Sequence, residues 1–318
     1  YRGEWLVETI NSSKGAVLVT DAVLLEKLRP VERELHYDRL LLRGPLEMAG
    51  EGFARRGVMS FDELADNAEA EIETRHIRFG DAAAVLWTSG TTGKPKGVIQ
   101  SHNVWIRAAL NNDRLYGTRP GDVAYNCLPL YNSAAWVANI YRALSTGIPC
   151  ALDEQFSVSK FWGRIRHYGA TQTMTLGAMH MFLWNEPRRT DDADNPLRVA
   201  SMVPMPQKLI APFCERFGLE AIVQGLGQSE VMPILSKVET PARQCKPNAL
   251  GKLFDDMEVK LLRDDGEEAG PGEVGEFSIR PLAPHVIFSG YFDDPEATSR
   301  AYRGEWYCTG DLGMKDAE

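Results

Sequence analysis

One short segment, residues 88–97, gathers residue types that can bind phosphate. It reads TSGTTGKPKG and contains four hydroxyl side chains, three glycines and two lysines. Phosphate oxygens need cations and closely approaching backbone amides, and glycine permits that approach. Apolar runs flank the segment on both sides, which predicts a loop between two strands. A flexible linker would not need two lysines at such a position, so we expect the loop to hold the polyphosphate of a nucleotide.

The spacing of this loop differs from that of the P-loop in nucleotide triphosphatases. A P-loop reads G-x-x-x-x-G-K-[ST] and runs directly into a helix, whereas here the glycines are three apart and Pro95 follows Lys94. The segment instead resembles the phosphate loop of the adenylate-forming superfamily, which includes acyl-CoA synthetases, firefly luciferase and the adenylation domains of peptide synthetases. That loop reads [ST]-[ST]-G-[ST]-T-G-x-P-K-G, and residues 88–97 match it at every position. The resemblance extends from the first residues to Gly313.

Three further segments resemble motifs of the same family in the same order. Residues 225–230 (GLGQSE) are similar to G-Y-G-x-T-E, and residues 275–280 followed by 289–291 are similar to G-E-[IL]-x-[IV]-[RK] and x-G-Y. Residues 306–313 (WYCTGDLG) resemble W-[FY]-x-T-G-D-x-G. The resemblance implies nucleotide binding by Thr88, Ser89, Gly90, Thr91, Thr92, Gly93, Lys94, Lys96, Gly225, Leu226, Gly227 and Ser229, a Mg²⁺ ligand at Glu230 and a ribose ligand at Asp311.

The implied reaction is attack of a carboxylate on the α-phosphorus of ATP, which gives an acyl-adenylate and pyrophosphate. The thiol of coenzyme A then displaces AMP. Because attacker and target are both anions, Mg²⁺ and nearby cations must reduce their repulsion while the reactants are held in line. We expect Thr88, Lys96 and Glu230 to act in catalysis, without a protein nucleophile. The alternatives are an amino-acid or aryl-acid adenylation domain, or a nucleotide-binding relative without catalysis.

The acid site is only partly visible in the sequence. After a Pro-Leu-Tyr run stands Asn132, where family members that activate fatty acids often have histidine and those that activate amino acids have a nearby aspartate. An uncharged asparagine leaves an α-ammonium unpaired, which is costly in a buried site, so amino-acid activation is the less favoured alternative. We expect the acid to contact Asn132, Trp136, Gly177 and Met202. Apart from Asn132 these residues suit a fatty or aromatic acid, although any one of them could equally be an ordinary core residue.

Two departures from the family pattern bear on the nucleotide site. Leu226 stands where the family has a tyrosine against the adenine ring, which removes stacking worth about 1 kcal/mol. Ser201 and Met202 replace a Gly-Gly pair, so a side chain could narrow the pocket where backbone normally approaches the ligand. Both departures favour the alternative of a protein that only binds nucleotide.

The elements that position these motifs follow from the hydrophobic pattern. Short aliphatic runs alternate with helical patterns up to about residue 250, which predicts an α/β fold with a mostly parallel, helix-covered sheet. Strands are expected at 16–20, 83–88, 123–128, 171–175, 198–203 and 220–224, and helices at 21–28 and 207–217. Beyond Gly251, two strands around a turn at 263–266 predict a smaller antiparallel subdomain.

We therefore expect two domains, an α/β adenylate-forming core at 1–250 and a β-rich subdomain at 251–318. Two polar or glycine-rich stretches, residues 44–57 and 185–196, are expected to be mobile.

Composition limits the class of protein. The 318 residues carry 35 Lys and Arg against 44 Asp and Glu, a net charge of −9, so no basic field favours nucleic acid as a partner. The five cysteines show neither metal nor disulfide spacing, which indicates a cytoplasmic protein. No apolar run reaches the roughly 18 residues of a membrane helix. The expected partners are a small carboxylic acid, ATP and coenzyme A, and a homodimer is a further expectation.

The family continues beyond the segment at 306–313 into a hinge and a small C-terminal domain with a catalytic lysine. The chain stops at Glu318, and fewer residues precede Thr88 than usually precede this motif in the family. We expect a partial enzyme that lacks the C-terminal domain and is incomplete at both ends. Alone, it should make little or no acyl-adenylate.

Overall fold

The computed structural model describes the chain except residues 1, 55–56, 67–75, 89–94, 244 and 318. Its contacts divide the chain into two units, which we call the first unit (Tyr1–Ile77 with Trp87–Gly97) and the second unit (Arg78–Leu86 with Val98–Glu318). The predicted domain boundary at residue 250 does not coincide with this division. It falls inside the second unit, where a mostly parallel sheet gives way to an antiparallel one.

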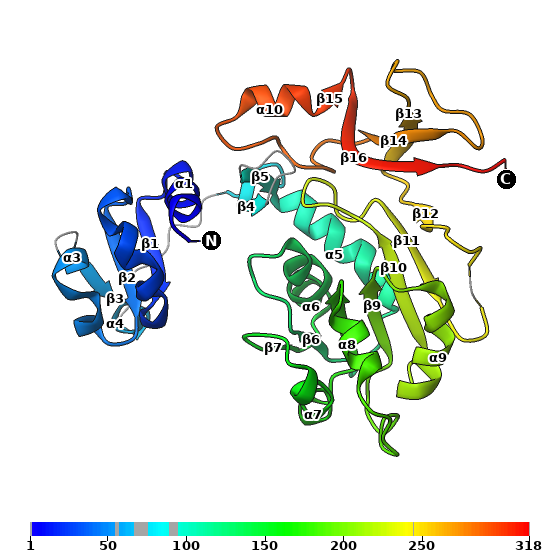
Figure 1. Cartoon of the computed structure of the whole chain (residues 1–318), viewed down its shortest axis with the longest axis horizontal. Helices are drawn as coiled ribbons and strands as arrows, with labels where there is room; N and C mark the ends of the chain where they lie inside the picture. Colours follow the sequence, from blue (N-terminus) through cyan, green and yellow to red (C-terminus); the bar gives the residue numbers. More distant parts are fainter. Residues whose placement is uncertain (1, 55–56, 67–75, 89–94, 244, 318) are drawn as a thin grey trace. The chain divides into compact units, whose positions relative to one another are not determined.

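The first unit contains a three-stranded parallel sheet in the order β1 (Val17–Asp21), β2 (Arg39–Arg43) and β3 (Val58–Ser60) (Figure 1). Helices α1 (Glu4–Ser12), α2 (Leu25–Leu28), α3 (Gly50–Ala54) and α4 (Phe61–Asp66) accompany it, with 3-10 turns η1 (Ala22–Leu24), η2 (Arg29–Glu34) and η3 (Leu46–Ala49). The Asp21 carboxylate accepts from the backbone N–H of Val23 and caps the predicted helical segment. The chain continues past Pro30 in the 3-10 helix η2. Pro30 lies in the first turn of η2, where a missing backbone N–H costs no hydrogen bond.

The expected mobile stretch at 44–57 is wrong in part, because η3 and α3 lie within it. Phe53 is fully buried, and Ala49 is 3% exposed. Both belong to the core of the first unit together with Leu40 and Leu42 of β2. Burial of one aromatic side chain stabilises a fold by roughly 2–3 kcal/mol, and this outweighs the local preference of the glycines for irregular structure.

The second unit is built on a seven-stranded sheet in the order β12-β11-β10-β9-β8-β6-β7. These strands are β6 (Ala124–Asn126), β7 (Cys150–Leu152), β8 (Gln172–Leu176), β9 (Val199–Val203), β10 (Ala221–Leu226), β11 (Leu235–Glu239) and β12 (Lys252–Leu253). Neighbours from β10 to β7 are parallel, whereas β11 and β12 pair antiparallel. The predicted mostly parallel sheet is confirmed.

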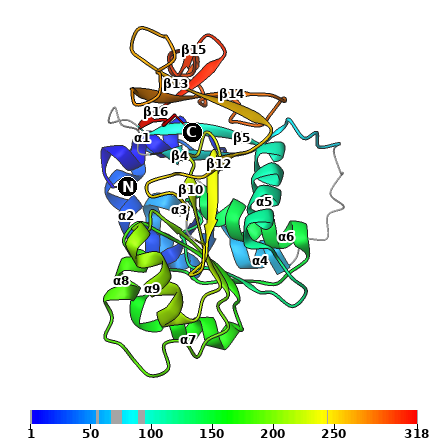
Figure 2. The same cartoon turned by 90° about the vertical axis from the view of Figure 1, so that its right-hand side faces the viewer.

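Helices cover both faces of this sheet (Figure 2). On one face lie α7 (Val158–Tyr168), α8 (Met179–Asn185) and α9 (Gln207–Phe217), and on the other lie α5 (His102–Tyr116), the π-helical turn η4 (Ala135–Ile140) and α6 (Tyr141–Thr146). Ser101 caps α5 by accepting from the N–H of Val104, and Gly117 ends it in a left-handed conformation. Trp162 of α7 stacks on Phe217 of α9 with ring centroids 4.4 Å apart. Parallel strands covered on both faces explain why their sequences read as continuous apolar runs.

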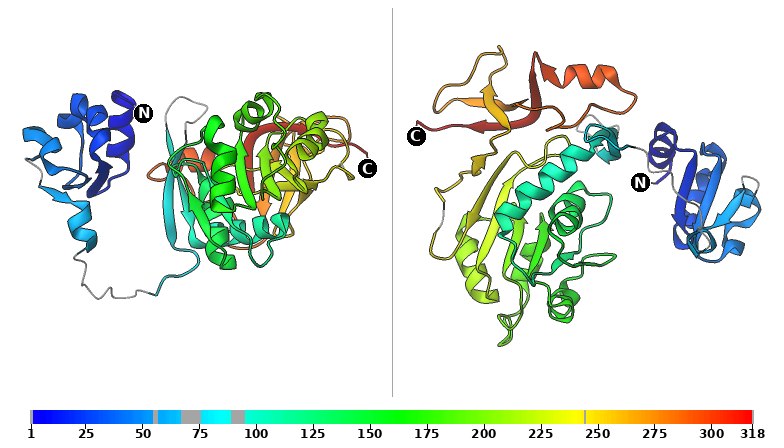
Figure 3. Two further views of the ribbon diagram at one scale, coloured as in Figure 1. Left: turned by 90° about the horizontal axis from the view of Figure 1, so that it is seen from below. Right: turned by 180° about the vertical axis from the view of Figure 1, so that it is seen from behind.

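The predicted antiparallel subdomain is also confirmed. Its four strands follow the order β13 (Met257–Leu262), β14 (Val274–Pro281), β16 (Trp306–Met314) and β15 (Tyr302–Arg303). The turn after β13 closes where the N–H of Gly266 donates to the carbonyl of Arg263 at 2.9 Å. Helix α10 (Pro295–Arg300) lies beside β15 (Figure 3). A separate two-stranded sheet pairs β4 (Ala82–Thr88) with β5 (Lys96–Ser101).

Residues 185–196, also expected to be mobile, are held by Arg216 of α9. Its Nε donates to Asp192 at 2.7 Å and its Nη2 donates to the carbonyl of Glu186 at 2.8 Å. Of the charged side chains that suggested a solvated loop, Asp192 pairs with the buried Arg216 and Asp191 with Arg166. All five cysteines are free, and no helix in the described ranges is long and apolar enough to cross a membrane.

Candidate functional site

The centre of the predicted phosphate loop, Ser89, Gly90, Thr91, Thr92, Gly93 and Lys94, lies outside the described residues. Its two ends are described. Thr88 is the last residue of β4 and Lys96 the first of β5. The Thr88 hydroxyl donates to the carbonyl of Lys96 at 3.5 Å. The loop therefore connects two paired strands, as the flanking apolar runs predict.

The residues that follow the loop contact two of the other motif segments within the second unit. Val98 pairs with Tyr291 in an antiparallel bridge, and the N–H of Ile99 donates to the carbonyl of Gly290 at 3.0 Å. The side-chain amide of Gln100 donates to the carbonyl of Ser229 at 2.6 Å. Segments separated by more than 120 residues in the sequence thereby meet at one place.

Glu230, the predicted Mg²⁺ ligand, is fixed from the antiparallel side of this meeting point. The hydroxyl of Tyr291 donates to Glu230 Oε1 at 2.9 Å, and the N–H of Phe288 donates to the Glu230 carbonyl at 2.8 Å. Burial and the neighbouring Glu230 carboxylate raise the pKa of Tyr291, so its hydroxyl keeps its proton and remains a donor. A carboxylate oriented in this way fits a hard cation such as Mg²⁺.

No group of three or more His, Cys, Asp or Glu side chains that could hold a metal occurs among the residues that the structure covers. Mg²⁺ that binds with a nucleotide is usually held by one or two carboxylates together with the substrate phosphates.

Asp311, the predicted ribose ligand, is joined to the 225–230 segment by Gln228. The Gln228 Nε2 donates to Asp311 Oδ2 and to the carbonyl of Thr309, both at 2.8 Å. The hydroxyl of Tyr307 donates to Gln228 Oε1 at 3.1 Å. Sequence reasoning missed Gln228, because it stands at the one unspecified position of its motif. One Asp311 oxygen thus anchors the carboxylate, which leaves the other for a diol.

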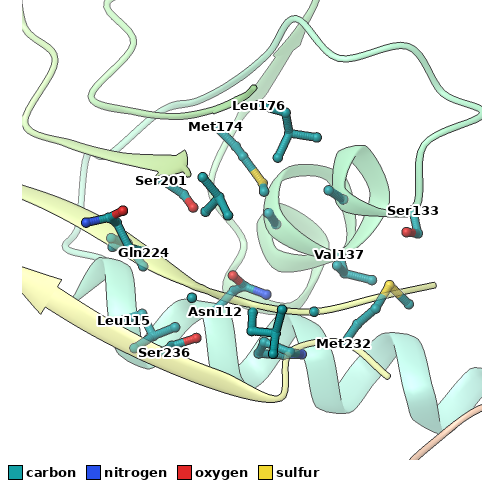
Figure 4. Close-up of a pocket in the computed structure, with 18 of the residues that line it drawn as sticks. Asn112, Leu115, Ser133, Val137, Met174, Leu176, Ser201, Gln224, Met232 and Ser236 are labelled. Carbon is teal, nitrogen blue, oxygen red and sulfur yellow. The ribbon is translucent and has the colours of Figure 1, made fainter. Parts of the chain in front are cut away.

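A cavity of about 360 Å³ lies next to these segments, at the carboxyl ends of β8, β9 and β10 (Figure 4). Its walls come from α5, η4, four strands of the large sheet and the segment after β10. Among the predicted site residues, those that line it are Asn132, Gly225, Leu226, Gly227 and Ser229. The crevice at the carboxyl ends of parallel strands is where open α/β sheets bind ligands.

Three predicted acid-binding residues are not among those that line the cavity, and each has another structural role. Met202 is fully buried in the core between the sheet and α9, on the opposite face from Ser201. The indole N–H of Trp136 donates to the carbonyl of Leu130 at 2.7 Å, and its ring lies 5.1 Å from that of Trp105. Gly177 adopts a φ of +55° in the turn that follows β8.

The two departures from the family pattern therefore differ in their effect. Because side chains alternate along a strand, Ser201 borders the cavity whereas Met202 cannot narrow it. The buried Tyr116 hydroxyl donates to the carbonyl of Thr173 at 2.9 Å, and Thr173 neighbours Ser201 across the paired strands β8 and β9. Leu226 lines the cavity and also packs against the apolar core of the antiparallel subdomain, so it supplies an apolar wall without an aromatic ring.

Close packing of two strands explains one glycine of the 225–230 segment. Gly225 pairs with Ser236 across β10 and β11. A Cβ at Gly225 would lie 2.3 Å from the carbonyl oxygen of Leu235 and 2.7 Å from the Ser236 hydroxyl. The chain can make this approach only with glycine.

Several cavity residues could not be predicted from motifs. They lie on α5, η4, β8, β11 and the segment between β10 and β11, and include Asn112, Leu115, Val137, Met174, Met232 and Ser236 (Figure 4). Their sequences read as ordinary amphipathic or strand patterns, and only the fold brings them together. The pairing of Ser236 with Gly225 becomes visible only when the sheet register is known.

The sequence matches one family model and is similar to known CoA ligases. A family model described as AMP-binding enzyme matches residues 1–292. A crotonobetaine/carnitine–CoA ligase of Salmonella paratyphi A is 29% identical over 321 residues, which cover 99% of this chain and 61% of that protein. Its counterpart in Escherichia fergusonii is 28% identical, with 99% and 60% covered. The chain thus spans about three fifths of the length of these relatives.

Solved structures show the same architecture. The anthranilate CoA ligase AuaEII in complex with anthranoyl-AMP superposes with a TM-score of 0.85 at 21% identity, covering 100% of this chain and 60% of that one. A putative long-chain-fatty-acid CoA ligase from Rhodopseudomonas palustris gives 0.81 at 20% identity, with 99% and 75% covered. The o-succinylbenzoate CoA synthetase of Bacillus subtilis bound to AMP gives 0.72 at 23% identity, with 98% and 69% covered. These likenesses confirm the predicted fold.

Proposed function

Because this chain belongs to the AMP-binding enzyme family, we propose that it forms the nucleotide- and acid-binding part of an AMP-forming acid–thiol ligase. The ligase would join a carboxylic acid to ATP as an acyl-adenylate and then transfer the acyl group to coenzyme A. The match of residues 88–97 to the family's phosphate loop and the CoA ligases among the relatives support this proposal.

One observation carries the proposal furthest. Gln100, Glu230, Tyr291 and Asp311, which lie in or directly beside four separate motif segments, belong to one hydrogen-bonded assembly next to the cavity. A nucleotide site needs a carboxylate for Mg²⁺ and another for the ribose within the reach of one ligand. In this proposal Glu230 is the first of these carboxylates and Asp311 the second.

Each residue has a proposed task in that assembly. Asp311 would bind the ribose hydroxyls and Ser229 a phosphate, while the loop from Thr88 to Lys96 would hold the β- and γ-phosphates. Glu230 would hold Mg²⁺, which when bound reduces the charge on the phosphates. The chain's own side chains hold the two carboxylates in place, through Tyr291 and Gln228. In-line attack depends on such positioning.

The cavity is the proposed site of the acid. Asn132 at its wall is uncharged, so an α-ammonium would lack a partner there. This favours a fatty or aryl acid over an amino acid. The proposed partners are therefore small molecules, namely the acid, ATP and coenzyme A. A cytoplasmic location and a homodimer stay predictions.

The test is exchange of labelled pyrophosphate into ATP with a panel of fatty, aryl and amino acids. It should be run on the 318-residue chain and on the same chain joined to the C-terminal domain of a family member. We expect exchange in the joined protein that depends on a fatty or aryl acid. Exchange with amino acids alone would favour the amino-acid alternative, and nucleotide binding without exchange would contradict the ligase assignment.

A further inference from the structure

The cavity lining is uncharged. Among the described residues that border it, none is acidic or basic, none is histidine and none is Phe, Tyr or Trp. A buried ion without a counter-charge is costly. A quaternary ammonium group also needs a carboxylate or an aromatic cage. The cavity therefore suits a tail that carries no charge.

Charged side chains near the cavity lie on the far face of its wall. Lys237 of β11 contacts Glu239 at 3.1 Å, and Gln224 of β10 donates to Glu239 at 2.7 Å. Gln224 also accepts from the N–H of Met205 at 2.9 Å. Because side chains alternate along a strand, Lys237 and Glu239 face α9 and not the cavity, whereas the uncharged Gln224 also borders the cavity. The charges of Lys237 and Glu239 are satisfied within this network.

The pairing of the strands shows which cavity residues lie deep and which lie nearer the carboxyl ends of the strands. Ser201 stands opposite both Met174 and Val223 in the deeper row, and Gly225 stands opposite Ser236 one step closer to the carboxyl ends. β10 ends at Leu226, and Ser229 and Glu230 follow in the segment after it. A carboxylate activated at this end of the cavity would thus direct its tail past Ser236.

Two polar atoms beside this path form no hydrogen bond with a described residue. The hydroxyl of Ser236, a residue only 9% exposed, makes no hydrogen bond to a described residue. Asn112 of α5 donates through Nδ2 to the carbonyl of Ala108 at 2.8 Å, and its Oδ1 accepts from no described group. Helix α5 packs against β11, and both residues line the cavity (Figure 4). Buried residues such as Ser236 nearly always have their polar atoms hydrogen-bonded, so its hydroxyl, together with the amide oxygen of the partly buried Asn112, points to a ligand group in the cavity.

We propose that the acid has a single carboxylate and an uncharged, mainly apolar tail that bears a hydroxyl group. The hydroxyl donates to Asn112 Oδ1 and accepts from the Ser236 hydroxyl, which a methyl group, a second carboxylate or a quaternary ammonium cannot do. This inference rests on the proposed function, because it takes the cavity as the site of the acyl tail. The proposed acid differs from carnitine, which is named as the substrate of a relative of this chain.

The test is calorimetric binding of acyl-sulfamoyl adenosines, which mimic acyl-adenylates and need no catalysis. Two matched pairs exchange a hydroxyl for a methyl group, hydroxyhexanoyl against heptanoyl and para-hydroxybenzoyl against para-toluoyl. Two further tails end in trimethylammonium and in carboxylate. In at least one pair the hydroxyl compound should bind about tenfold more tightly. Both charged tails should bind at least about a hundredfold more weakly.

Two variants link the preference to the named residues. Ser236→Ala should abolish the hydroxyl preference while the methyl compounds keep their affinity. Asn112→Asp should improve binding of the trimethylammonium tail by about tenfold or more, a gain that unfolding cannot produce. Thermal unfolding of each variant checks its fold.

The outcomes are separable. Equal binding of hydroxyl and methyl compounds in both pairs, or tight binding of a charged tail by the unaltered chain, would overturn this inference alone. Failure of every compound to bind, adenosine sulfamate included, would overturn the proposed function and this inference with it.

Discussion

Gly225 is the residue at which the backbone of the site has least freedom. A methyl group there would meet the carbonyl oxygen of Leu235 at 2.3 Å, and a strand backbone cannot move aside without losing ladder hydrogen bonds. We expect Gly225→Ala to lower the free energy of unfolding by about 1–3 kcal/mol. It should also abolish binding of an acyl-adenylate mimic.

Gly227 provides the matched control for this substitution. Its nearest neighbours to an added Cβ are 3.5 Å away, an ordinary contact distance. Urea denaturation and calorimetry should find Gly227→Ala close to the unaltered chain in stability. Equal stability of both variants would contradict the packing argument.

Tyr291 orients the proposed metal ligand through its hydroxyl. We expect Tyr291→Phe to weaken binding of Mg·ATP by about tenfold, as loss of a group that orients a metal ligand typically does. Binding of metal-free AMP should be unchanged, because that ligand does not use Glu230. Titration calorimetry with both ligands measures the difference.

Tyr302→Phe serves as the control, since Tyr302 belongs to the same aromatic cluster and its hydroxyl bonds to no described residue. An equal loss of Mg·ATP and AMP affinity in Tyr291→Phe would show a structural role only. The same loss in Tyr302→Phe would show that the aromatic cluster, and not the Glu230 bond, determines affinity.

At this scale the structure places several predicted motif residues at the cavity and three of the predicted acid-binding residues elsewhere. Motif positions such as Gly225 and Ser229 line the cavity because they stand at the end of β10 or directly after it. The motif in the sequence already marks this position. Met202 and Trp136 were chosen for their apolar side chains. Which face such a side chain takes depends on strand register and helix packing, which a single sequence does not reveal.

At the scale of elements, Glu239 stabilises the edge where β10, β11 and α9 meet. It is fully buried. Burial alone would raise its pKa, but hydrogen bonds from Gln207, Lys237 and Gln224 outweigh burial and hold the pKa below its usual value. A pKa that is lower in the folded state contributes stability above the unfolded pKa, which is lost as the pH falls through the folded value.

We therefore expect the chain to lose stability as the pH drops below about 4.5, the ordinary glutamate range. Glu239→Gln should make that dependence shallower while lowering the free energy of unfolding at neutral pH by about 3 kcal/mol, because Lys237 loses its partner. Urea denaturation between neutral and acidic pH measures both effects. An unchanged pH slope in Glu239→Gln would contradict the role of this carboxylate.

The element pattern was predictable where periodicity is strong. The runs at 171–175, 198–203 and 220–224 became β8, β9 and β10, and helix α9 has its predicted bounds. The stretch at 44–57 was misread because its glycines and lack of period obscure Phe53, whose burial fixes α3. Long-range packing of one side chain is not a local signal.

At the scale of the whole molecule, ligand binding should stabilise the fold, because the assembled site exists only in the folded state and not in the unfolded chain. At a ligand concentration 100 times its Kd, an acyl-adenylate mimic should raise the free energy of unfolding by about 2.7 kcal/mol. Thermal unfolding in the presence and absence of the mimic measures this shift. Asp311→Asn, which weakens the proposed ribose contact, should reduce the shift at the same ligand concentration, and an undiminished shift would place the ribose elsewhere.

The division into two units was not predictable from the sequence. The change from a parallel to an antiparallel pattern near residue 251 is a change of sheet within the second unit. The first unit instead has its own small core, which includes residues of β2 and α3. The hydrophobic pattern of the sequence reflects local strand pairing. The boundaries of a unit depend instead on which parts of the chain pack into one core.

The most direct test of the account is a crystal structure of the chain with a bound acyl-sulfamoyl adenosine. The account predicts the ribose at Asp311, the sulfamate beside Ser229 and the acyl tail inside the cavity between α5 and β8–β11. A ligand whose ribose lies away from Asp311, or whose tail lies outside that cavity, would contradict it.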